Sequence, residues 1–208
     1  MIRLALPKGR NLKVALAAFR AAGVALADPE PDDRRLQMTV PLDGLEVLFL
    51  KDWDVPLYVQ HGVADCGVVG SDVLDEVDGD LLVPARFRHG TSRLSFIGRG
   101  AEMPEAGQQI RLATKYPATA RRLVQDRPWG AEILELSGSV ELAPLLDLAE
   151  LALDIVQTGR TLAENRLREL ETVCEVAPCL VVNRGAFQLL RREINGLLER
   201  FEEARMVV

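Results

Sequence analysis

The chain has 208 residues, of which 48% are hydrophobic and 27% are charged, and its formal net charge is -6 with a pI near 5.1. This composition suffices for a substantial core, in one large domain or two small ones, and excludes an extended disordered chain. The acidic balance argues against a nucleic-acid-binding protein, so basic residues that bind a polyanion must converge locally.

The cysteines and histidines form no recognisable metal or disulfide pattern. Cys66, Cys174 and Cys179 lack paired spacing, and His61 and His89 complete no set of metal ligands. The apolar run at the start is too short for a signal peptide, and no later run approaches membrane-spanning length. We therefore expect a soluble protein of the reducing cytoplasm, without membrane contact, in which the cysteines are packed thiols.

Strand-length apolar segments alternate with segments of helical period along the chain. Strands are predicted at residues 2–6, 45–50, 66–69, 94–97, 110–113, 133–136, 151–156 and 180–182. Helices are predicted at residues 12–22, 55–60, 118–124 and, as one amphipathic helix, from 186 to about 205. This alternation predicts an α/β fold.

Two connecting stretches indicate a chain of two lobes. Residues 83–90 and 171–178 are interpreted as crossings between the lobes, and a polar stretch with Gly and Pro at 99–109 interrupts the strand pattern between them. We expect residues 1–87 plus 176–208 to form lobe I and residues 88–175 to form lobe II. The second lobe is then an insertion within the first.

The most informative segment is residues 151–162, where an apolar strand ends in the turn Thr158 to Thr161 before a helix-compatible run. Free backbone amides, two hydroxyls and a helix N-terminus there can hold a phosphate, and Gly159 lets the backbone approach it. Asp154 on the same strand is placed to accept hydrogen bonds from ribose hydroxyls. An ordinary Thr-Gly turn after a strand with a buried Asp is the alternative.

Several cations follow other predicted strands. Lys8 and Arg10 follow the first strand, Lys51 follows another, Lys115 follows a strand of the second lobe, and Arg93 lies in or beside a strand. Ligands of open α/β sheets bind at the carboxyl ends of the strands, which makes these side chains candidates for phosphate contacts. Solvated surface cations are the alternative.

Two carboxylates follow small-residue turns at helix starts. Glu141 is a candidate to hydrogen-bond a nucleotide or to hold Mg²⁺ through water, with a carboxylate favoured by the helix dipole as the alternative. Asp72 follows the Gly70-Ser71 turn in the same way. Asp54 is predicted to cap the helix that begins at Val55.

Together, these segments resemble the ATP phosphoribosyltransferase family in identity, order and spacing across nearly the whole chain. The matching pieces are Leu-Pro-Lys-Gly-Arg at 6–10, Asp-Val-Pro at 54–56, Gly-Val-Ala-Asp at 62–65, Gly-Ser-Asp-Val-Leu at 70–74, Ala-Thr-Lys-Tyr-Pro at 113–117, Ser-Gly-Ser-Val-Glu-Leu-Ala-Pro at 137–144 and Asp-Ile-Val-Gln-Thr-Gly-Arg-Thr-Leu at 154–162.

The resemblance implies two lobes of the type II periplasmic-binding-protein kind, with ATP and phosphoribosyl pyrophosphate meeting in a cleft between them. It implies a glycosyltransferase that moves the 5-phosphoribosyl group to a ring nitrogen of ATP, releases pyrophosphate and begins histidine biosynthesis. Mg²⁺ is expected to arrive with the substrates rather than at a metal site of the protein.

The residue roles follow from the matching positions and from the need to neutralise two polyphosphates. The catalytic candidates are Lys51, Arg10 and Arg34. The candidates for binding phosphoribosyl pyrophosphate are Asp154, Thr158, Gly159, Arg160 and Thr161. The candidates for binding ATP are Lys8, Arg10, Asp72, Arg93, Lys115 and Glu141.

The chain ends after the last predicted helix, near Arg205, where long-form family members continue into a regulatory domain. It resembles the short form, which implies a homodimer within a hetero-oligomer whose regulatory subunit is similar to histidyl-tRNA synthetase. Two departures are Lys51, where many members have Arg, and residues 87–92, which replace a more usual run containing Gly-Lys-Cys. The role of residues 87–92 is open.

Two rival functions are consistent with parts of the pattern. A solute-binding protein would share the two lobes, but would normally be exported. A phosphoribosyltransferase for another base commonly carries two adjacent acids in its loop, whereas Leu153 precedes Asp154 here.

Overall fold

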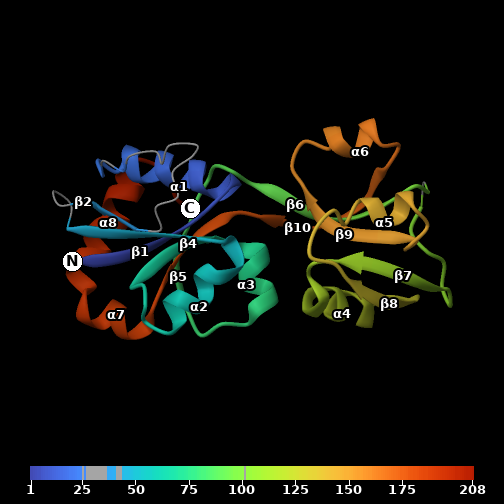
Figure 1. Ribbon diagram of the computed structural model, residues 1–208, viewed down its shortest axis with the longest axis horizontal. Helices are drawn as coiled ribbons and strands as arrows, with labels where there is room; N and C mark the ends of the chain where they lie inside the picture. Colours follow the sequence, from blue (N-terminus) through green and yellow to red (C-terminus); the bar gives the residue numbers. More distant parts are fainter. Residues whose placement is uncertain (25, 27–36, 41–43, 101) are drawn as a thin grey trace. The chain divides into compact units, whose positions relative to one another are not determined.

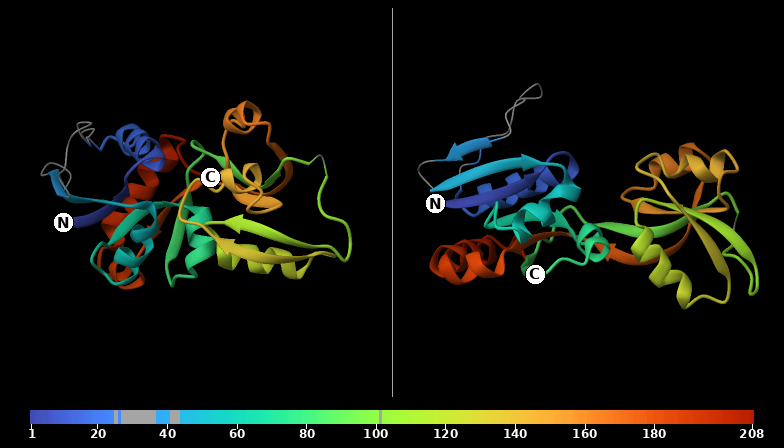
Figure 2. Two further views of the ribbon diagram at one scale, coloured as in Figure 1. Left: turned by 45° about the vertical axis from the view of Figure 1, so that its right-hand side comes forward. Right: turned by 60° about the horizontal axis from the view of Figure 1, so that its bottom comes forward.

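The computed structural model describes residues 1–24, 26, 37–40, 44–100 and 102–208, with the backbone alone for residues 37–40 (Figure 1). The described chain forms two compact units: Met1–Gly90 with Ala177–Val208, and Thr91–Val176. In each unit, helices pack on both faces of one mixed β-sheet (Figure 2). No helix among the described residues is long and apolar enough to span a membrane.

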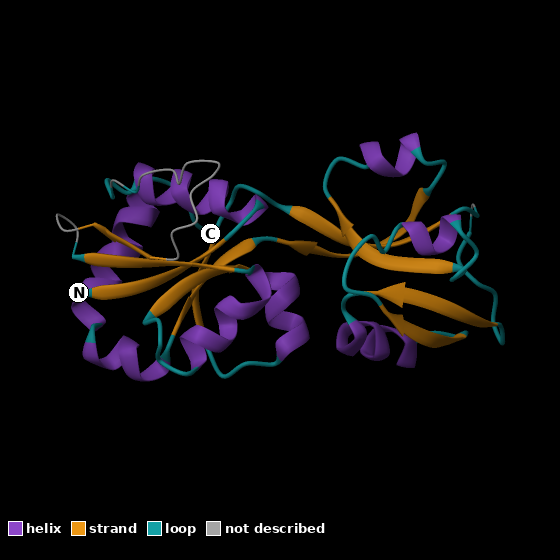
Figure 3. Cartoon of the chain, in the orientation of Figure 1, coloured by secondary structure: helices purple, strands orange, loops and turns teal. Residues whose placement is uncertain are grey.

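The sheet of the first unit has the strand order β2-β3-β1-β4-β11-β5 (Figure 3). Its strands are β1 Ile2–Pro7, β2 Gln37–Val40, β3 Leu45–Leu50, β4 Cys66–Gly70, β5 Leu82–Arg86 and β11 Pro178–Val182; its helices are α1 Arg10–Ala21, a 3₁₀ helix Asp52–Asp54, α2 Val55–Gln60, α3 Ser71–Val77, α7 Arg184–Leu189 and α8 Arg191–Glu203. Strand β1 runs parallel to β3 and β4, whereas β11 is antiparallel to β4 and β5.

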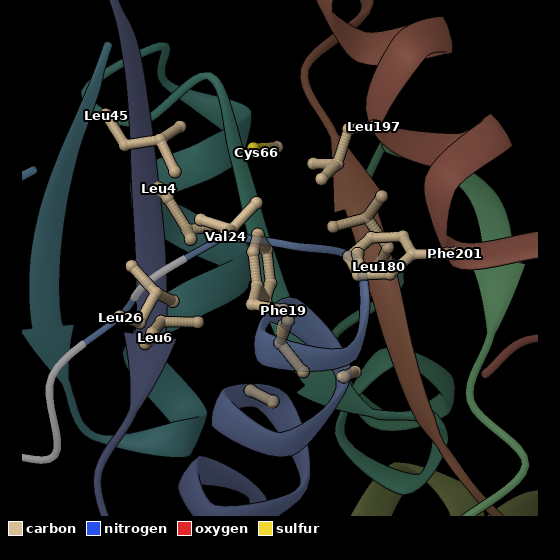
Figure 4. Close-up of a cluster of buried hydrophobic side chains, with 14 of the residues drawn as sticks. Leu4, Leu6, Phe19, Val24, Leu26, Leu45, Cys66, Leu180, Leu197 and Phe201 are labelled. Atoms are coloured by element: carbon tan, nitrogen blue, oxygen red, sulfur yellow. The ribbon is translucent and has the colours of Figure 1, made fainter. Parts of the chain in front are cut away.

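Two apolar layers enclose this sheet. On one face, Phe19 of α1 and Phe201 of α8 meet edge to face with ring centroids 5.1 Å apart, and they pack with Leu4 and Leu180 of the sheet (Figure 4). On the other face, α2 and α3 contribute buried side chains such as Val55. Each buried Leu or Phe contributes about 1.5–3 kcal/mol, which holds the strand ends in fixed positions.

The sheet of the second unit has the strand order β10-β6-β9-β7-β8. Its strands are β6 Ser92–Gly98, β7 Gln109–Thr114, β8 Gly130–Glu135, β9 Leu151–Val156 and β10 Arg168–Val176; its helices are α4 Pro117–Gln125, α5 Leu142–Leu145 and α6 Arg160–Glu164. Helix α4 covers one face together with Tyr116 and Trp129, and α5 and α6 cover the other. Strands β7, β8 and β9 are mutually parallel, whereas β6 is antiparallel to β9 and β10.

Most predicted elements are confirmed within about two residues, and the exceptions have physical causes. Strand β8 begins three residues before the predicted position. The prediction of a single C-terminal helix is wrong, because the backbone leaves helical geometry at Leu190 and forms two helices, α7 and α8. The first stretch predicted as a crossing contains most of β5, an edge strand, where Pro84 is tolerated. The second contains much of β10, where two register shifts interrupt the alternation of side chains between the two faces of the sheet. Strand β2 was not predicted.

Candidate functional site

The carboxyl ends of three parallel strands meet at one edge of the first unit's sheet. The register pairs Pro7 at the end of β1 with Leu50 at the end of β3, and the Lys8 N–H donates to the Leu50 carbonyl at 2.7 Å. The predicted residues Lys8, Arg10, Lys51 and Asp72 directly follow the ends of β1, β3 and β4. The structure therefore brings these four candidates of the first unit to one edge.

A cavity of about 660 Å³ opens at this edge. Lys8 and Lys51 line it with exposed ammonium-bearing side chains, together with the exposed Asp54 carboxylate, the exposed ring of Tyr58 and apolar residues such as Leu50. Ammonium groups suit phosphate, and a flat aromatic ring suits a planar base. The cavity thus has the chemistry of a nucleotide site, and Tyr58 is a lining residue that the sequence analysis did not single out.

Buried polar residues hold this edge in place. Asn11 of α1 is buried, and its Nδ2 donates to Oδ2 of Asp52 at 3.2 Å, which ties the start of α1 to the segment after Lys51. Asp72 is also buried, and a Cβ at Gly70 would overlap its Oδ1 atom. These contacts, like Asn11 itself, were not predicted.

The predicted side-chain cap of α2 is wrong. Asp54 stands at the N-cap position, but its backbone is helical, with φ -87° and ψ -23°, and its side chain makes no capping bond. The preceding 3₁₀ helix leads directly into α2, so the extended backbone that an N-cap needs is lost.

The second unit presents a comparable edge at the carboxyl ends of β7, β8 and β9. Lys115 follows β7, Glu141 precedes α5 in the segment after β8, and the turn Thr158 to Thr161 follows β9. Glu141 is half-buried with a helical backbone. Arg34, the remaining catalytic candidate, lies outside the described residues.

The turn after β9 presents polar groups to solvent. Gly159 has φ +70°, a left-handed conformation that favours glycine, and Arg160 begins α6 directly after it. The Arg160 N–H donates to Oγ1 of Thr158 at 3.4 Å, and the side chains of Thr158, Arg160 and Thr161 are exposed. Exposed hydroxyls, a guanidinium and backbone amides together suit a phosphate ligand.

Asp154 lies beside Lys115 at the same edge. Nζ of Lys115 is 3.3 Å from Oδ1 of Asp154, and only 17% of the Asp154 side chain is exposed. This contact is an ion pair, and the buried Oδ1 accepts no hydrogen bond from the described residues. A buried acceptor without a hydrogen bond calls for an explanation such as a catalytic role, although the Lys115 ammonium offsets part of the cost of burying Oδ1.

Arg93 is held by a carboxylate that the sequence analysis did not single out. Its Nε and Nη2 donate to the two oxygens of Glu169 at 2.9 and 2.8 Å, and Glu169 also accepts from the hydroxyls of Ser95 at 2.7 Å and Thr172 at 2.8 Å. Hydrogen bonds from Arg93, with those of the two hydroxyls, lower the pKa of Glu169 to about 2 against the effect of burial. Glu169 is therefore ionised at neutral pH.

The buried cysteines are not nucleophiles at neutral pH. Burial raises the pKa of Cys66 to about 12, with a smaller contribution from Asp65, and burial raises the pKa of Cys179 to about 11. Both thiols pack in apolar clusters or against backbone, as expected for structural residues. Cys174 is exposed on β10, so the expectation of a packed thiol is wrong for that residue.

Two α/β units, the second inserted in the chain of the first, define a two-lobed protein of the periplasmic-binding-protein type, which confirms the predicted fold class. A solved substrate-binding protein of an amino acid ABC transporter shares this fold, with a TM-score of 0.53 and 12% identity over 98% of this chain and 96% of that chain. That likeness concerns the fold alone.

The family is shown by closer matches. The family model for ATP phosphoribosyltransferase matches residues 51–203. The chain is 42% identical to an ATP phosphoribosyltransferase of Deinococcus radiodurans, over 97% of this chain and 90% of the relative, and 43% identical to that of Sorangium cellulosum, over 98% and 95%. It also matches a chain of the ATP phosphoribosyl transferase (HisG:HisZ) complex from Thermotoga maritima, with a TM-score of 0.82, 33% identity and 98% coverage of both chains. The chain belongs to the ATP phosphoribosyltransferase family, which confirms the predicted resemblance.

Proposed function

We propose that this chain transfers the 5-phosphoribosyl group of phosphoribosyl pyrophosphate to a ring nitrogen of the adenine of ATP, with release of pyrophosphate, as the first step of histidine biosynthesis. Family membership supports the reaction. The observation that carries the proposal is the pairing of the solvent-facing turn Thr158 to Thr161 with the buried, hydrogen-bond-free Oδ1 of Asp154 on the preceding strand.

The second unit supplies the phosphoribosyl contacts in this proposal. Asp154 accepts hydrogen bonds from the ribose hydroxyls, and the Lys115 ammonium, 3.3 Å from Oδ1, orients its carboxylate. The 5-phosphate binds the amides and hydroxyls of Thr158, Gly159 and Thr161, with the exposed Arg160 guanidinium beside it.

The first unit supplies the nucleotide contacts. Lys8 and Lys51 face the cavity of about 660 Å³ and neutralise phosphate oxygens, while the Tyr58 ring is suited to the face of a purine. Arg10 and Arg34 join Lys51 in stabilising the charge that develops on the leaving group, and Asp72 and Glu141 are assigned to the nucleotide. Nε and Nη2 of Arg93 already donate to Glu169, so Arg93 contacts a polyphosphate oxygen through one of its remaining N–H groups.

The proposed chemistry is a single displacement at the anomeric carbon. The lone pair of an adenine ring nitrogen forms the new C–N bond, while the C–O bond to pyrophosphate breaks and its electron pair leaves with the pyrophosphate oxygen. No side-chain nucleophile is required, so the protein contributes alignment of the two substrates and positive charge around the departing group. Attack opposite the leaving group inverts the anomeric centre.

We assign Mg²⁺ to the substrates rather than to a cage built by the protein. The described residues contain no group of three or more His, Cys, Asp or Glu side chains that gather as metal ligands. Mg²⁺ keeps several waters and binds substrate phosphates readily, so it neutralises polyphosphate charge when bound with them. The residues of this chain then contact the phosphates directly.

We also propose a regulatory partner and a cytoplasmic location. The solved relative from Thermotoga maritima is a chain of a HisG:HisZ complex, and the match covers nearly the whole of both chains. By this likeness, we propose that the chain assembles with a HisZ subunit. The short-form resemblance further implies a homodimer of the chain and a partner similar to histidyl-tRNA synthetase, which raises turnover and confers inhibition by histidine.

A stoichiometric assay tests the proposal and separates it from solute binding. The chain and the synthetase-like subunit are mixed with ATP, Mg²⁺ and phosphoribosyl pyrophosphate, and pyrophosphate is measured. Release of one pyrophosphate for each phosphoribosyl-ATP formed is expected. Binding of phosphoribosyl pyrophosphate without any release would support the solute-binding alternative and overturn the proposal.

A further inference from the structure

A row of polar side chains crosses three neighbouring strands of the second unit. Strand β6 lies between β10 and β9, and the register places Ser95 directly between Thr172 of β10 and Asp154 of β9. Directly opposed residues point their side chains to the same face, with Cβ atoms about 4.5–5.5 Å apart. Ser95 is fully buried; its hydroxyl contacts Glu169, and its cross-strand neighbour on β9 is Asp154.

The Ser95 hydroxyl is used by Glu169 rather than by Asp154. A serine hydroxyl has one hydrogen to donate, and Ser95 donates it to Oε1 of Glu169 at 2.7 Å. Arg93 is two residues from Ser95 on β6 and therefore on the same face, diagonal to Asp154. The Arg93 guanidinium likewise donates two hydrogen bonds to Glu169.

Asp154, next to this network, keeps Oδ1 buried and without a hydrogen bond, with the Lys115 ammonium as its ion-pair partner. We propose that Glu169 is a positioning residue, which holds Ser95 and Arg93 away from Asp154 and so keeps a second cation from pairing with the carboxylate that binds the ribose hydroxyls. This inference rests on the proposed function. Without the Glu169 charge, the Arg93 cation on the same face pairs with Asp154, and the sugar must displace it.

Glu171 on the same strand offers a matched control. The register pairs Glu169 with Ile97 and Glu171 with Phe96, so the two carboxylates point to opposite faces of the sheet. Glu171 accepts two hydrogen bonds from Arg127, one of them at 2.9 Å, and the Arg127 guanidinium lies over the Phe96 ring. Glu171 therefore forms an equivalent ion pair that does not face Asp154.

The test compares Glu169→Gln with Glu171→Gln in the full-length chain, with calorimetric titration of phosphoribosyl pyrophosphate and of ATP. Glu169→Gln should raise the Kd for phosphoribosyl pyrophosphate at least about tenfold, or 1.4 kcal/mol, and should raise it more than the Kd for ATP, to which Arg93 is also assigned. Glu171→Gln should change neither Kd. Equal effects of the two variants on phosphoribosyl pyrophosphate would overturn the inference and assign Glu169 to stability alone.

A double variant separates positioning from folding. In Glu169→Gln with Arg93→Met, the freed cation is removed, and the Kd for phosphoribosyl pyrophosphate should lie within about threefold of that of Arg93→Met alone, which carries the loss of any phosphate contact of Arg93. Both members of the pair are then neutral, so this variant carries the test even if Glu169→Gln alone does not fold. A double variant that folds but binds phosphoribosyl pyrophosphate at least tenfold more weakly than Arg93→Met alone would overturn the inference. A wild-type chain that binds no phosphoribosyl pyrophosphate would instead overturn the proposed function.

Discussion

The Lys115 ammonium lies 3.3 Å from Oδ1 of Asp154, where β7 and β9 end side by side. One residue follows a strand and the other belongs to its neighbour, so the contact depends on the parallel register rather than on sequence proximity. The pair places a charged acceptor next to the turn that begins at Thr158.

Replacement of Asp154 by Asn should weaken the binding of phosphoribosyl pyrophosphate by about one to two powers of ten, because charge-assisted hydrogen bonds contribute about 1.5–3 kcal/mol to affinity. The KM for this substrate and the turnover number report the change. Asp147→Asn is the control, since Asp147 is an exposed carboxylate of the same unit that pairs with Arg99. If both variants kept wild-type kinetics, Asp154 would have no part in the site.

Replacement of Lys51 by Met should slow pyrophosphate release without unfolding the protein, because Lys51 is exposed at the cavity of the first unit. Lys51→Arg should retain more activity, since it keeps the charge. Lys13→Met, an exposed lysine of α1, is the matched control. Equal losses in the Arg and Met variants would contradict a charge-stabilising role.

Gly159→Ala should impair phosphoribosyl pyrophosphate binding, because φ is +70° and a side chain there costs about 1–2 kcal/mol in the left-handed region. Gly107→Ala carries the same kind of strain, at φ +82° with open space around it, but lies before β7 and away from the turn. Melting temperatures should fall similarly in both variants, and the KM for phosphoribosyl pyrophosphate should rise only in Gly159→Ala. A similar rise in both would assign the effect to stability.

The contribution of Glu169 to stability should depend on pH. Its folded pKa, about 2, lies below its ordinary value of 4.5, so the stabilisation is complete above about pH 4.5 and is lost as the pH falls toward 2. In urea unfolding, the difference between wild type and Glu169→Gln should be on the order of 1 kcal/mol at pH 6 and shrink toward pH 2. A difference that is constant from pH 6 to pH 2 would disagree with this ionisation.

The synthetase-like subunit should raise turnover of the chain and make it sensitive to histidine. Allosteric inhibition needs a second site whose ligand favours one state, and we assign that site to the partner. Steady-state rates of the chain alone and of the complex, each with and without histidine, measure both effects. Strong histidine inhibition of the chain alone would contradict this assignment.

The sequence predicts those parts of the fold that local patterns determine. Strand β3 and helix α2 match their predicted bounds because short apolar runs and Pro56 mark them. Strand β10 was missed because its two register shifts break the alternation of side chains. The helix break at Leu190 has no glycine or proline to signal it.

The candidate site shows the same limit. The turn after β9 was found because glycine and hydroxyl residues mark it in the sequence. The link between Glu169 and Ser95 spans 74 positions and depends on cross-strand register, which no local pattern reports. The same holds for Asn11 and Asp52, which are 41 positions apart.

Phosphoribosyl transfer to ATP is tested most directly by following the anomeric carbon from substrate to product. Phosphoribosyl pyrophosphate labelled with ¹³C at that carbon is followed by NMR in the presence of Mg²⁺, ATP, the chain and the synthetase-like subunit. The labelled signal should move to that of an inverted, β-linked N-glycoside, and only when ATP is present. A label that stays in phosphoribosyl pyrophosphate, or that appears in free ribose 5-phosphate regardless of ATP, would contradict phosphoribosyl transfer to ATP.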